Sequence, residues 1–307
     1  MLTLLVKNKN MRDIKKINTI RNILKWAISI LKEYDIESPE INADTLLAYV
    51  LSCDRTKLYT NPDKIVKDNA INKYKELINK RKRHIPLQYI TRHAEFMSLD
   101  FVVDERALIP RPETEILVET VLSKAQSKIF SNKTIIIMDI GTGSGNIAVS
   151  LTMNLKNAET YASDISKEAL TVARTNAQRH EIVDRIHLLQ GDIFGAFDSQ
   201  LEKGCVDFIV SNPPYVSESE WNKLEPEIRE HEPREALVGG KDGLCFYKQI
   251  INEATDWLKP KGYLVLEVEE TQATTIVKFM EMEGRYMYIE VIKDLQGKER
   301  VISARRK

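Results

Sequence analysis

Apolar positions recur every three or four residues between about residues 18 and 83, which is the period of an amphipathic helix. Asn42 precedes one of these apolar faces, and we expect it to cap that helix. A further helix is expected over residues 68–83, where it ends in a run of basic residues. The pattern predicts an all-helical domain over residues 1–85, with residues 1–17 as a disordered extension.

The helical period stops near residue 86. Glu95-Phe96-Met97 and Phe101-Val102-Val103 predict the two strands of a short hairpin, and we interpret residues 86–107 as a linker between two domains. Beyond it, Thr114 is placed to cap a helix over residues 115–125.

From residue 133 onwards, short apolar runs rich in β-branched residues alternate with helical segments. This pattern predicts an α/β domain over residues 108–307, with a mostly parallel sheet covered by helices. The seven expected strands are 134–139, 159–163, 186–190, 205–210, 263–268, 286–293 and 300–304. The last two are expected to form a hairpin, which completes a seven-stranded Rossmann-like sheet.

The fourth expected strand stops abruptly at Asn212, Pro213, Pro214 and Tyr215. Proline has a fixed φ and no N–H group, and it keeps the preceding residue out of the helical region, so two in succession force a stiff, extended elbow. The elbow holds an asparagine side chain and bare carbonyl groups at the carboxyl end of a strand, where open α/β sheets bind ligands.

The elbow suits a planar amino group. The Asn212 side-chain oxygen and a carbonyl of the Pro-Pro unit are two acceptors at fixed spacing, which complement the two N–H bonds of an –NH2 group, and Tyr215 adds a flat face. Amide and aryl amino nitrogens are poor nucleophiles, so correct aim and acceptors on their hydrogens would supply much of the rate. Taken alone, the tetrapeptide is equally compatible with a rigid turn.

A glycine-rich loop follows the first expected strand and precedes a helix, so its N–H groups attract negative charge and its backbone can approach a ligand. Such a loop is compatible with NAD, flavin or S-adenosylmethionine. Its G-x-G-x-G spacing, with Asp139 before it, differs from the dinucleotide pattern, and an acid there suits a cationic amino group, which favours S-adenosylmethionine. The loop residues are Gly141, Thr142, Gly143, Ser144 and Gly145.

Two further acidic residues follow expected strands. Asp164, at the tip of the second strand, is placed for ribose hydroxyls, and a helix cap is its alternative role. Asp192 and Ile193 follow the third strand, where a carboxylate and an apolar wall suit the edge and face of an adenine. Together with the seven-stranded pattern, these features describe a class I S-adenosylmethionine-dependent methyltransferase.

Two segments between the expected elements are candidates for ligand contacts. Residues 216–243 form a long, acidic stretch punctuated by proline and glycine, which we interpret as a lid over the substrate. In the segment before residue 115, two prolines bracket Arg111, which lies with Glu113 and Glu115 near a charged ligand if this is a cofactor loop. An ordinary helix start is the alternative.

Charge narrows the possible partners. Lys+Arg and Asp+Glu both total 45, so no overall field draws the protein to nucleic acid or an anionic membrane. Residues 1–85 carry 18 basic and 10 acidic residues, which leaves 27 and 35 for residues 86–307. No apolar run is long enough to span a bilayer.

The cysteines and the start of the chain bear on its compartment. The three cysteines lie far apart and give neither a disulfide framework nor a zinc site, which fits a reducing, cytoplasmic compartment. Residues 1–25 are basic, but their lack of serine and short apolar patch argue against a transit peptide and a secretory signal. Met11 is an alternative start.

From about Asn42 onwards, the chain resembles the protein release factor glutamine N5-methyltransferases. In the front domain the resemblance rests on Ala43-Asp44, Leu46-Leu47-Ala48, Asp54-Arg55-Thr56 and Pro86-Leu87-Gln88-Tyr89-Ile90. In the second domain it rests on Leu108 to Glu115, Asp139 to Gly145, Asn212 to Tyr215, Glu232 to Leu237, Gly239-Gly240 and Asp242-Gly243-Leu244. The glycine loop and Asn-Pro-Pro-Tyr are shared with DNA adenine and other amino-group methyltransferases, whereas Pro-Arg-Pro-Glu-Thr-Glu and Glu-Pro-Arg are more specific.

The resemblance implies methylation of the glutamine in the Gly-Gly-Gln motif of peptide-chain release factors, in translation termination. By position, Gly141 to Gly145 and Asp164 hold the cofactor, and Ile193 lies against the adenine. Asn212 and Pro213 hold the glutamine amide.

Two positions depart from the family pattern. Met97-Ser98 stands where the family usually has an aromatic residue followed by glycine, which bears on the shape of the hairpin. Glu269 stands where a glycine commonly follows Glu-Ile, which bears only on a strand end.

We therefore expect a monomeric S-adenosylmethionine-dependent enzyme that methylates a release factor glutamine by in-line displacement and needs no metal. Catalysis is assigned to positioning by the elbow, Asn212 to Tyr215, and Asn212 is also placed beside the cofactor. A glutamine in a ribosomal protein is the alternative substrate. DNA adenine is disfavoured, because DNA enzymes carry a basic groove and flip their base. A cofactor-binding translation factor without catalysis is disfavoured by the intact elbow and loop.

Overall fold

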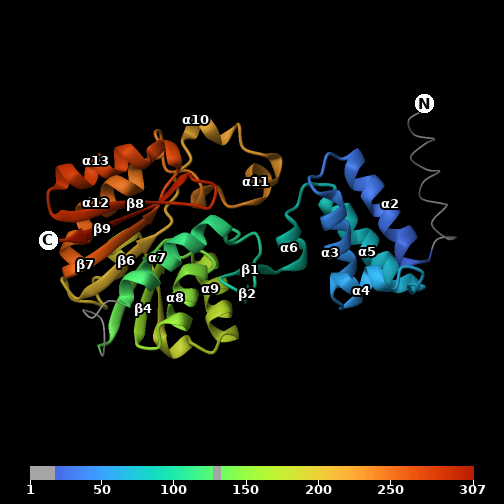
Figure 1. Cartoon of the computed structure of the whole chain (residues 1–307), viewed down its shortest axis with the longest axis horizontal. Helices are drawn as coiled ribbons and strands as arrows, with labels where there is room; N and C mark the ends of the chain where they lie inside the picture. Colours follow the sequence, from blue (N-terminus) through green and yellow to red (C-terminus); the bar gives the residue numbers. More distant parts are fainter. Residues whose placement is uncertain (1–17, 127–132) are drawn as a thin grey trace. The chain divides into compact units, whose positions relative to one another are not determined.

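The chain divides into two units between Thr91 and Arg92 (Figure 1). The computed structural model describes residues 18–126 and 133–307, so the extension predicted for residues 1–17 lies outside the described part. The division falls within residues 86–107, the range predicted as a linker. The predicted domain ends at residues 85 and 108 stay predictions.

The described part of the first unit is helical, as the period of its apolar residues predicts. Its helices are α2 (Ile20–Glu33), α3 (Pro39–Leu51), α4 (Arg55–Thr60), α5 (Asp68–Arg81) and α6 (Leu87–Thr91). Their apolar faces meet in one core, in which Leu31, Leu46 and Tyr74 are fully buried. The all-helical character therefore follows from amphipathic periodicity and burial.

Asn42 does not cap a helix, and this prediction was wrong. It lies inside α3, whose N-cap residue is Ser38. Its amide donates to the carbonyls of Glu37 and Ser38, and its oxygen accepts a hydrogen bond from the buried Arg81 at 2.7 Å. Because Arg81 comes from α5, only the packing of the helices supplies this partner.

The second unit contains the predicted seven-stranded, mostly parallel sheet, in the order β5-β4-β3-β6-β7-β9-β8. Only β9 runs antiparallel to its neighbours, so the last two strands pair as a hairpin. The strands are β3 (Ile135–Ile140), β4 (Ala158–Asp164), β5 (Ile186–Gln190), β6 (Val206–Ser211), β7 (Leu258–Glu267), β8 (Tyr286–Lys293) and β9 (Glu299–Arg306). β7 starts five residues earlier than predicted, at an irregularity in its pairing with β6.

Helices cover both faces of this sheet (Figure 1). One face carries α7 (Glu115–Ala125), α8 (Asn146–Asn154) and α9 (Lys167–Arg179), and the other carries α12 (Cys245–Trp257) and α13 (Ala273–Glu283). Shorter helices are η2 (Pro112–Thr114), η3 (Val183–Arg185), η4 (Ile193–Ala196), α10 (Glu218–Trp221), α11 (Pro226–His231), η5 (Arg234–Ala236) and η6 (Glu270–Gln272). Every residue of β6 is buried, including Asp207, as its mostly apolar run predicts for a central strand.

The hairpin is present, but its strands β1 (Ala94–Phe96) and β2 (Leu99–Phe101) start one and two residues earlier than predicted, and Met97 lies with Ser98 in the turn that joins them. Both turn residues have positive φ, 51° and 58°, as a two-residue hairpin turn of type I′ requires. The departure from the family pattern therefore leaves the hairpin intact, although neither residue favours this conformation. The Glu115 carboxylate accepts a hydrogen bond from the Met97 N–H at 2.6 Å and holds the turn.

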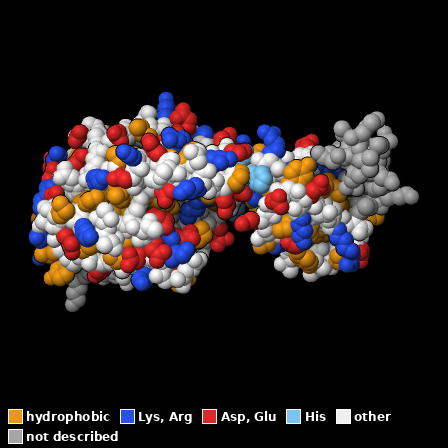
Figure 2. All heavy atoms as spheres, turned by 90° about the horizontal axis from the view of Figure 1, so that it is seen from above, with side chains coloured by type: hydrophobic (Ala, Val, Ile, Leu, Met, Phe, Trp, Pro, Cys, Tyr) orange, Lys and Arg blue, Asp and Glu red, His pale blue; other side chains and the backbone are white. Residues whose placement is uncertain are grey.

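The surface of the second unit carries charges of both signs. Figure 2 shows acidic and basic side chains interspersed over the visible face of this unit. Among the described residues, no helix has the length and apolar character that crossing a membrane requires.

Candidate functional site

A cavity lies at the carboxyl ends of the adjacent strands β5, β4, β3 and β6. Parallel strands end at the same edge of a sheet, so the residues that follow them converge there. The cavity wall includes the predicted residues Gly141, Gly143, Asp164, Asp192, Ile193, Asn212, Pro213 and Pro214. Four other predicted residues, Thr142, Ser144, Gly145 and Tyr215, do not line it. The functional roles of these residues stay predictions, but the structure brings most of the residues together around one cavity.

The glycine loop leaves open space beside the cavity. Gly141 and Gly143 have φ values of 72° and 55°, in the left-handed region that glycine adopts without strain. A Cβ atom at either position would meet no atom within 4 Å. A Cβ at Gly145 would come within 3.1 Å of the Ala173 Cβ, so this third glycine allows α8 to pack on α9.

Asp139 precedes the loop but does not reach the cavity. Its side chain is fully buried, and its Oδ2 accepts a hydrogen bond from the Thr142 hydroxyl at 2.7 Å. Burial raises the pKa of this carboxyl to about 7, against the lowering effect of that hydrogen bond. Its position does not support a direct contact with a cationic ligand, and Asp139 instead ties the loop to the end of β3.

Asp164 joins the glycine loop to the start of α9. Its Oδ2 accepts a hydrogen bond from the Gly143 N–H at 2.8 Å, and its Oδ1 accepts one from the Ser166 N–H at 2.9 Å. The cap of α9 is Ser166, whose hydroxyl accepts a hydrogen bond from the Ala169 N–H. Burial raises the pKa of Asp164 although both hydrogen bonds lower it. Each carboxylate oxygen keeps a lone pair that can accept a further hydrogen bond from the cavity.

Ile193 is held in a conformation that β-branched residues rarely adopt. Its φ is 42°, its side chain is buried, and it lines the cavity next to the exposed Asp192. Left-handed backbone at such a residue is strained, and this strain is typical of functional sites. The observation agrees with a fixed apolar wall at this point.

The elbow presents Asn212, Pro213 and Pro214 to the cavity, but not the ring of Tyr215. Tyr215 packs against the core of the sheet, and burial raises the pKa of its phenol to about 12. Its carbonyl accepts a hydrogen bond from the Gln272 side chain at 3.0 Å. The stacking role of Tyr215 stays a prediction, and its observed contacts anchor the elbow.

Two glycines of the segment 216–243 press against the elbow backbone. A Cβ at Gly239 would lie 2.2 Å from the Pro214 carbonyl oxygen, and one at Gly243 would lie 2.1 Å from that of Tyr215. Val216 adds hydrogen bonds to this segment, with its carbonyl accepting from the Gly239 N–H at 2.9 Å. The segment also contributes cavity-lining residues, although its lid function stays a prediction.

The sequence did not indicate a chain of contacts behind Asn212. The Asn212 Nδ2 donates to the Thr114 hydroxyl at 3.2 Å, and the nearby Thr114 side chain offsets part of the burial that raises the pKa of the Glu267 carboxyl. Thr114 stands at the start of α7, as predicted, but its side chain makes no capping hydrogen bond. The sequence feature that could have identified Glu267 is an acidic residue at the end of an apolar strand.

The residues around Arg111 lie outside the wall of this cavity, and their contact with a charged ligand stays a prediction. Arg111 pairs with the buried Glu232 at 2.6 Å, which ties the segment 216–243 to the start of η2. Neither Arg111, Glu113 nor Glu115 lines the cavity. Arg111 therefore links two loops, and Glu115 holds the hairpin turn.

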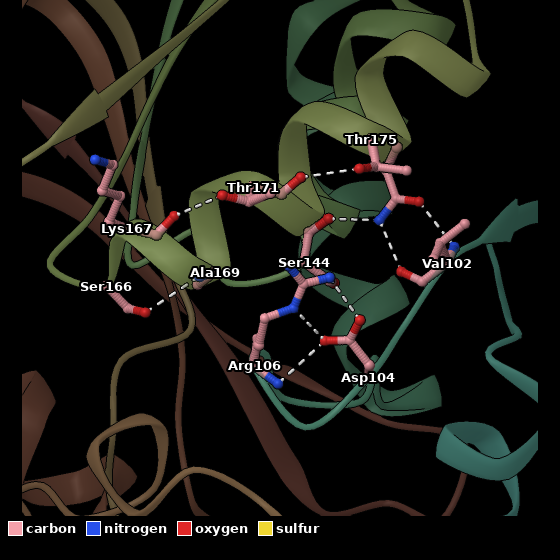
Figure 3. Close-up of polar contacts among 10 residues, drawn as sticks. Val102, Asp104, Arg106, Ser144, Ser166, Lys167, Ala169, Thr171 and Thr175 are labelled. Atoms are coloured by element: carbon pink, nitrogen blue, oxygen red, sulfur yellow. Dashed lines mark hydrogen bonds and ion pairs between the residues drawn. The ribbon is translucent and has the colours of Figure 1, made fainter.

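A buried asparagine connects the glycine loop to the segment after the hairpin (Figure 3). The Asn176 amide donates to the carbonyls of Val102 at 3.0 Å and Ser144 at 2.8 Å, and its oxygen accepts from the Val102 N–H. Nearby, Arg106 lines the cavity and makes two hydrogen bonds to Asp104, at 2.7 and 2.6 Å. The partners of Asn176 are distant from it in sequence, so the sequence alone did not reveal them.

Two family models match separate parts of the chain. Residues 22–91 match the family described as PrmC N-terminal domain, and residues 131–302 match the family described as Methyltransferase domain. A release factor glutamine methyltransferase of Clostridium acetobutylicum is 39% identical over 286 residues, which cover 93% of this chain and 98% of that protein. Another, from Rhodopirellula baltica, is 35% identical over 285 residues, which cover 93% and 95%.

A solved structure of a similar protein gives a further comparison. The release factor-specific protein-(glutamine-N5) methyltransferase of Alicyclobacillus acidocaldarius is 26% identical, with a TM-score of 0.41, over 67% of this chain and 99% of that chain. The identity and coverage of the two curated relatives extend over both units. The chain therefore belongs to the family of release factor glutamine methyltransferases.

Proposed function

We propose that the chain transfers a methyl group from S-adenosylmethionine to the side-chain amide nitrogen of the glutamine in the Gly-Gly-Gln motif of a peptide-chain release factor. The observation that carries the proposal is the elbow, which puts Asn212 and Pro213 on the wall of the same cavity as the glycine loop. Membership of the family supplies the substrate class. Such a substrate would place the enzyme where translation terminates.

The residues of the cavity fit the cofactor. Gly141 and Gly143 leave open space, and Asp164 offers its remaining lone pairs to ribose hydroxyls. Ile193 gives an apolar surface for an adenine face, and Asp192 an acceptor for its amino group. S-adenosylmethionine, when bound, supplies a methyl carbon on a positively charged sulfur.

The elbow would then act on the substrate amide. The Asn212 Oδ1 and the Pro213 carbonyl would accept the two amide hydrogens, which fixes the plane of the amide and directs its nitrogen. Acceptors on both hydrogens also increase electron density on the nitrogen. Because the elbow is stiff and held by Gly239 and Gly243, this orientation is established before the substrate arrives.

The test is incubation of the purified chain with S-adenosylmethionine and, separately, release factor, ribosomal protein and DNA. Mass spectrometry of peptides then locates any added methyl group. We expect one methyl on the Gly-Gly-Gln glutamine of the release factor and none on a Gly-Gly-Asn variant. Methylation of ribosomal protein or DNA, with an unmodified release factor, would contradict the proposal.

A further inference from the structure

We propose that Thr114 and Glu267 are positioning residues, which turn the Asn212 carboxamide so that its oxygen faces the cavity. The inference rests on the proposed function, because it concerns the side chain that holds the substrate amide. Neither Thr114 nor Glu267 lines the cavity, so both would act through Asn212.

The register of the sheet brings Glu267 close to Asn212. β6 and β7 are parallel neighbours in which Ser211 is paired with Leu266, so Asn212, the first residue after β6, follows beside Glu267, the last residue of β7. Thr114 is 1% exposed and reaches both of them from η2. Its Oγ1 accepts a hydrogen bond from the Asn212 Nδ2 at 3.2 Å, and its side chain is near enough to the Glu267 carboxyl to offset part of the burial that raises the pKa of that carboxyl.

The single hydrogen of the Thr114 hydroxyl decides how Asn212 is turned. An ionised carboxylate only accepts hydrogen bonds, and a hydroxyl has one proton to donate. When Thr114 gives this proton to Glu267, its oxygen can only accept from Asn212. The carboxamide must then direct its NH2 group to Thr114, which leaves Oδ1 for the cavity.

Burial makes this arrangement depend on Thr114. Glu267 is 1% exposed, and its Oε2 has no hydrogen-bond partner within the described part of the chain. Its backbone carbonyl accepts from the Tyr247 hydroxyl at 2.9 Å, which fixes its place. A buried carboxylate gains strongly from a hydrogen bond, so the Thr114 proton is directed to it. An inverted Asn212 would point its NH2 group at the substrate NH2 group.

The first test compares Thr114→Val, which removes the hydroxyl and keeps the shape, with Thr114→Ser, which keeps the hydroxyl. Assays at pH 8 keep Glu267 ionised, because burial raises its pKa to about 7. We expect kcat of T114V to fall about 10- to 100-fold, with a smaller change in KM and unchanged cofactor affinity, as for the loss of a supporting polar contact. T114S should stay within about threefold of the wild type. An undiminished kcat in T114V would overturn the proposal.

A purely structural role of Thr114 is separated by adding T114V to Asn212→Ala. If Thr114 acts through the carboxamide, its loss has no further effect once the carboxamide is absent. We expect N212A and the double variant to have kcat values within about twofold of each other, under single-turnover conditions. Equal losses from T114V in both backgrounds would overturn the proposal.

The side-chain NH2 group of Asn212 gives a readout that does not need turnover. In a chain labelled with 15N-asparagine, its signals are identified by their absence from the N212A spectrum. We expect its hydrogen-bonded proton to exchange with solvent at least about tenfold faster in T114V and in Glu267→Gln than in the wild type. Glu267→Gln is informative because a glutamine side chain can donate a hydrogen bond to the Thr114 oxygen. The Thr114 hydroxyl proton is then free to be donated to the Asn212 carboxamide.

The two proposals can fail separately. If these signals respond as expected but the wild type leaves a release factor unmodified, the proposed function fails and the orienting role stands. If exchange is unchanged in both variants, the orienting role is overturned, whatever the substrate.

Discussion

The glycine loop and the elbow form two walls of one cavity, and they use glycine in opposite ways. At Gly141 and Gly143 an added Cβ would point into open space, and glycine is needed for a positive φ. At Gly239 and Gly243 an added Cβ would collide with backbone carbonyls of the elbow. The first pair leaves room for a ligand, whereas the second pair fixes the position of the elbow, whose groups we propose to meet the substrate.

The glycine loop, which we propose to bind the cofactor, is therefore shaped by local backbone conformation. The elbow, which we propose to bind the substrate, is shaped by tertiary packing. Substitutions in the loop should therefore affect mainly cofactor affinity. Substitutions around the elbow should affect mainly turnover, because a small displacement of the acceptors misdirects the reacting nitrogen.

The largest effect is expected from Gly239→Ala. Its Cβ would lie 2.2 Å from the Pro214 carbonyl oxygen, so the elbow must move. We expect kcat to fall about 1000-fold, together with a lower melting temperature. Gly195→Ala is the matched control, since a Cβ there meets nothing within 4 Å and no positive φ is required. Similar activity of the two variants would show that the elbow is not held by this contact.

Asn212→Ala should come next. It removes one of the two acceptors but leaves the glycine loop unchanged, so we expect turnover to fall by about two orders of magnitude or more while cofactor affinity is kept. Calorimetry with S-adenosylmethionine and a methyl-transfer assay measure the two quantities. Normal turnover would remove Asn212 from the catalytic role.

Asp164→Ala should have the opposite effect, a loss of cofactor affinity with turnover largely kept. It removes the acceptor for the Gly143 and Ser166 N–H groups and the proposed ribose partner. We expect cofactor affinity to fall about 10- to 100-fold, with a smaller effect on kcat at saturating cofactor, because hydrogen bonds to charged groups contribute about 1.5–3 kcal/mol. Asp198→Ala, at an exposed position outside the cavity, is the control. Unchanged affinity by calorimetry would exclude the ribose role.

The smallest effect concerns the pH dependence of stability. It distinguishes Glu267, the buried acid behind the elbow, from Asp139, the buried acid before the glycine loop. Burial raises the pKa of Glu267 from an ordinary 4.5 to about 7, against the lowering effects of Thr114, Arg300 and Arg111. An acid with a raised folded pKa binds more protons in the folded state, so its contribution to stability is lost as pH rises from about 4.5 to 7.

Between pH 5 and 7 we therefore expect the free energy of unfolding of the wild type to fall by about 1–2 kcal/mol more than that of Glu267→Gln, since one pKa unit corresponds to about 1.4 kcal/mol. Urea titrations at both pH values measure this difference. Asp139, whose pKa burial also raises to about 7, contributes equally to both proteins and cancels. Parallel pH dependence of the two proteins would show that Glu267 is not perturbed.

Much of the fold was predictable because it depends on residues close in sequence. The bounds of the two edge strands, β5 and β8, were predicted in full, and those of β3, β4, β6 and β9 within two residues, since their apolar runs end at polar or turn residues. β7 was the exception, because its irregular start depends on pairing with β6. Helix caps were less predictable, as Asn42 shows, because an asparagine side chain can satisfy several neighbouring backbone groups.

Sequence by itself determined the stiffness of Asn212-Pro213-Pro214 and the openness of the glycine loop, since both follow from the φ preferences of proline and glycine. Only the tertiary structure decided which atoms support the elbow. Thr114 and Asn212 are 98 residues apart, and their contact depends on where η2 is held beside the ends of β6 and β7. Local preferences fix the shape of a segment, but a buried polar group takes its partner from whatever the packing of distant segments places within reach.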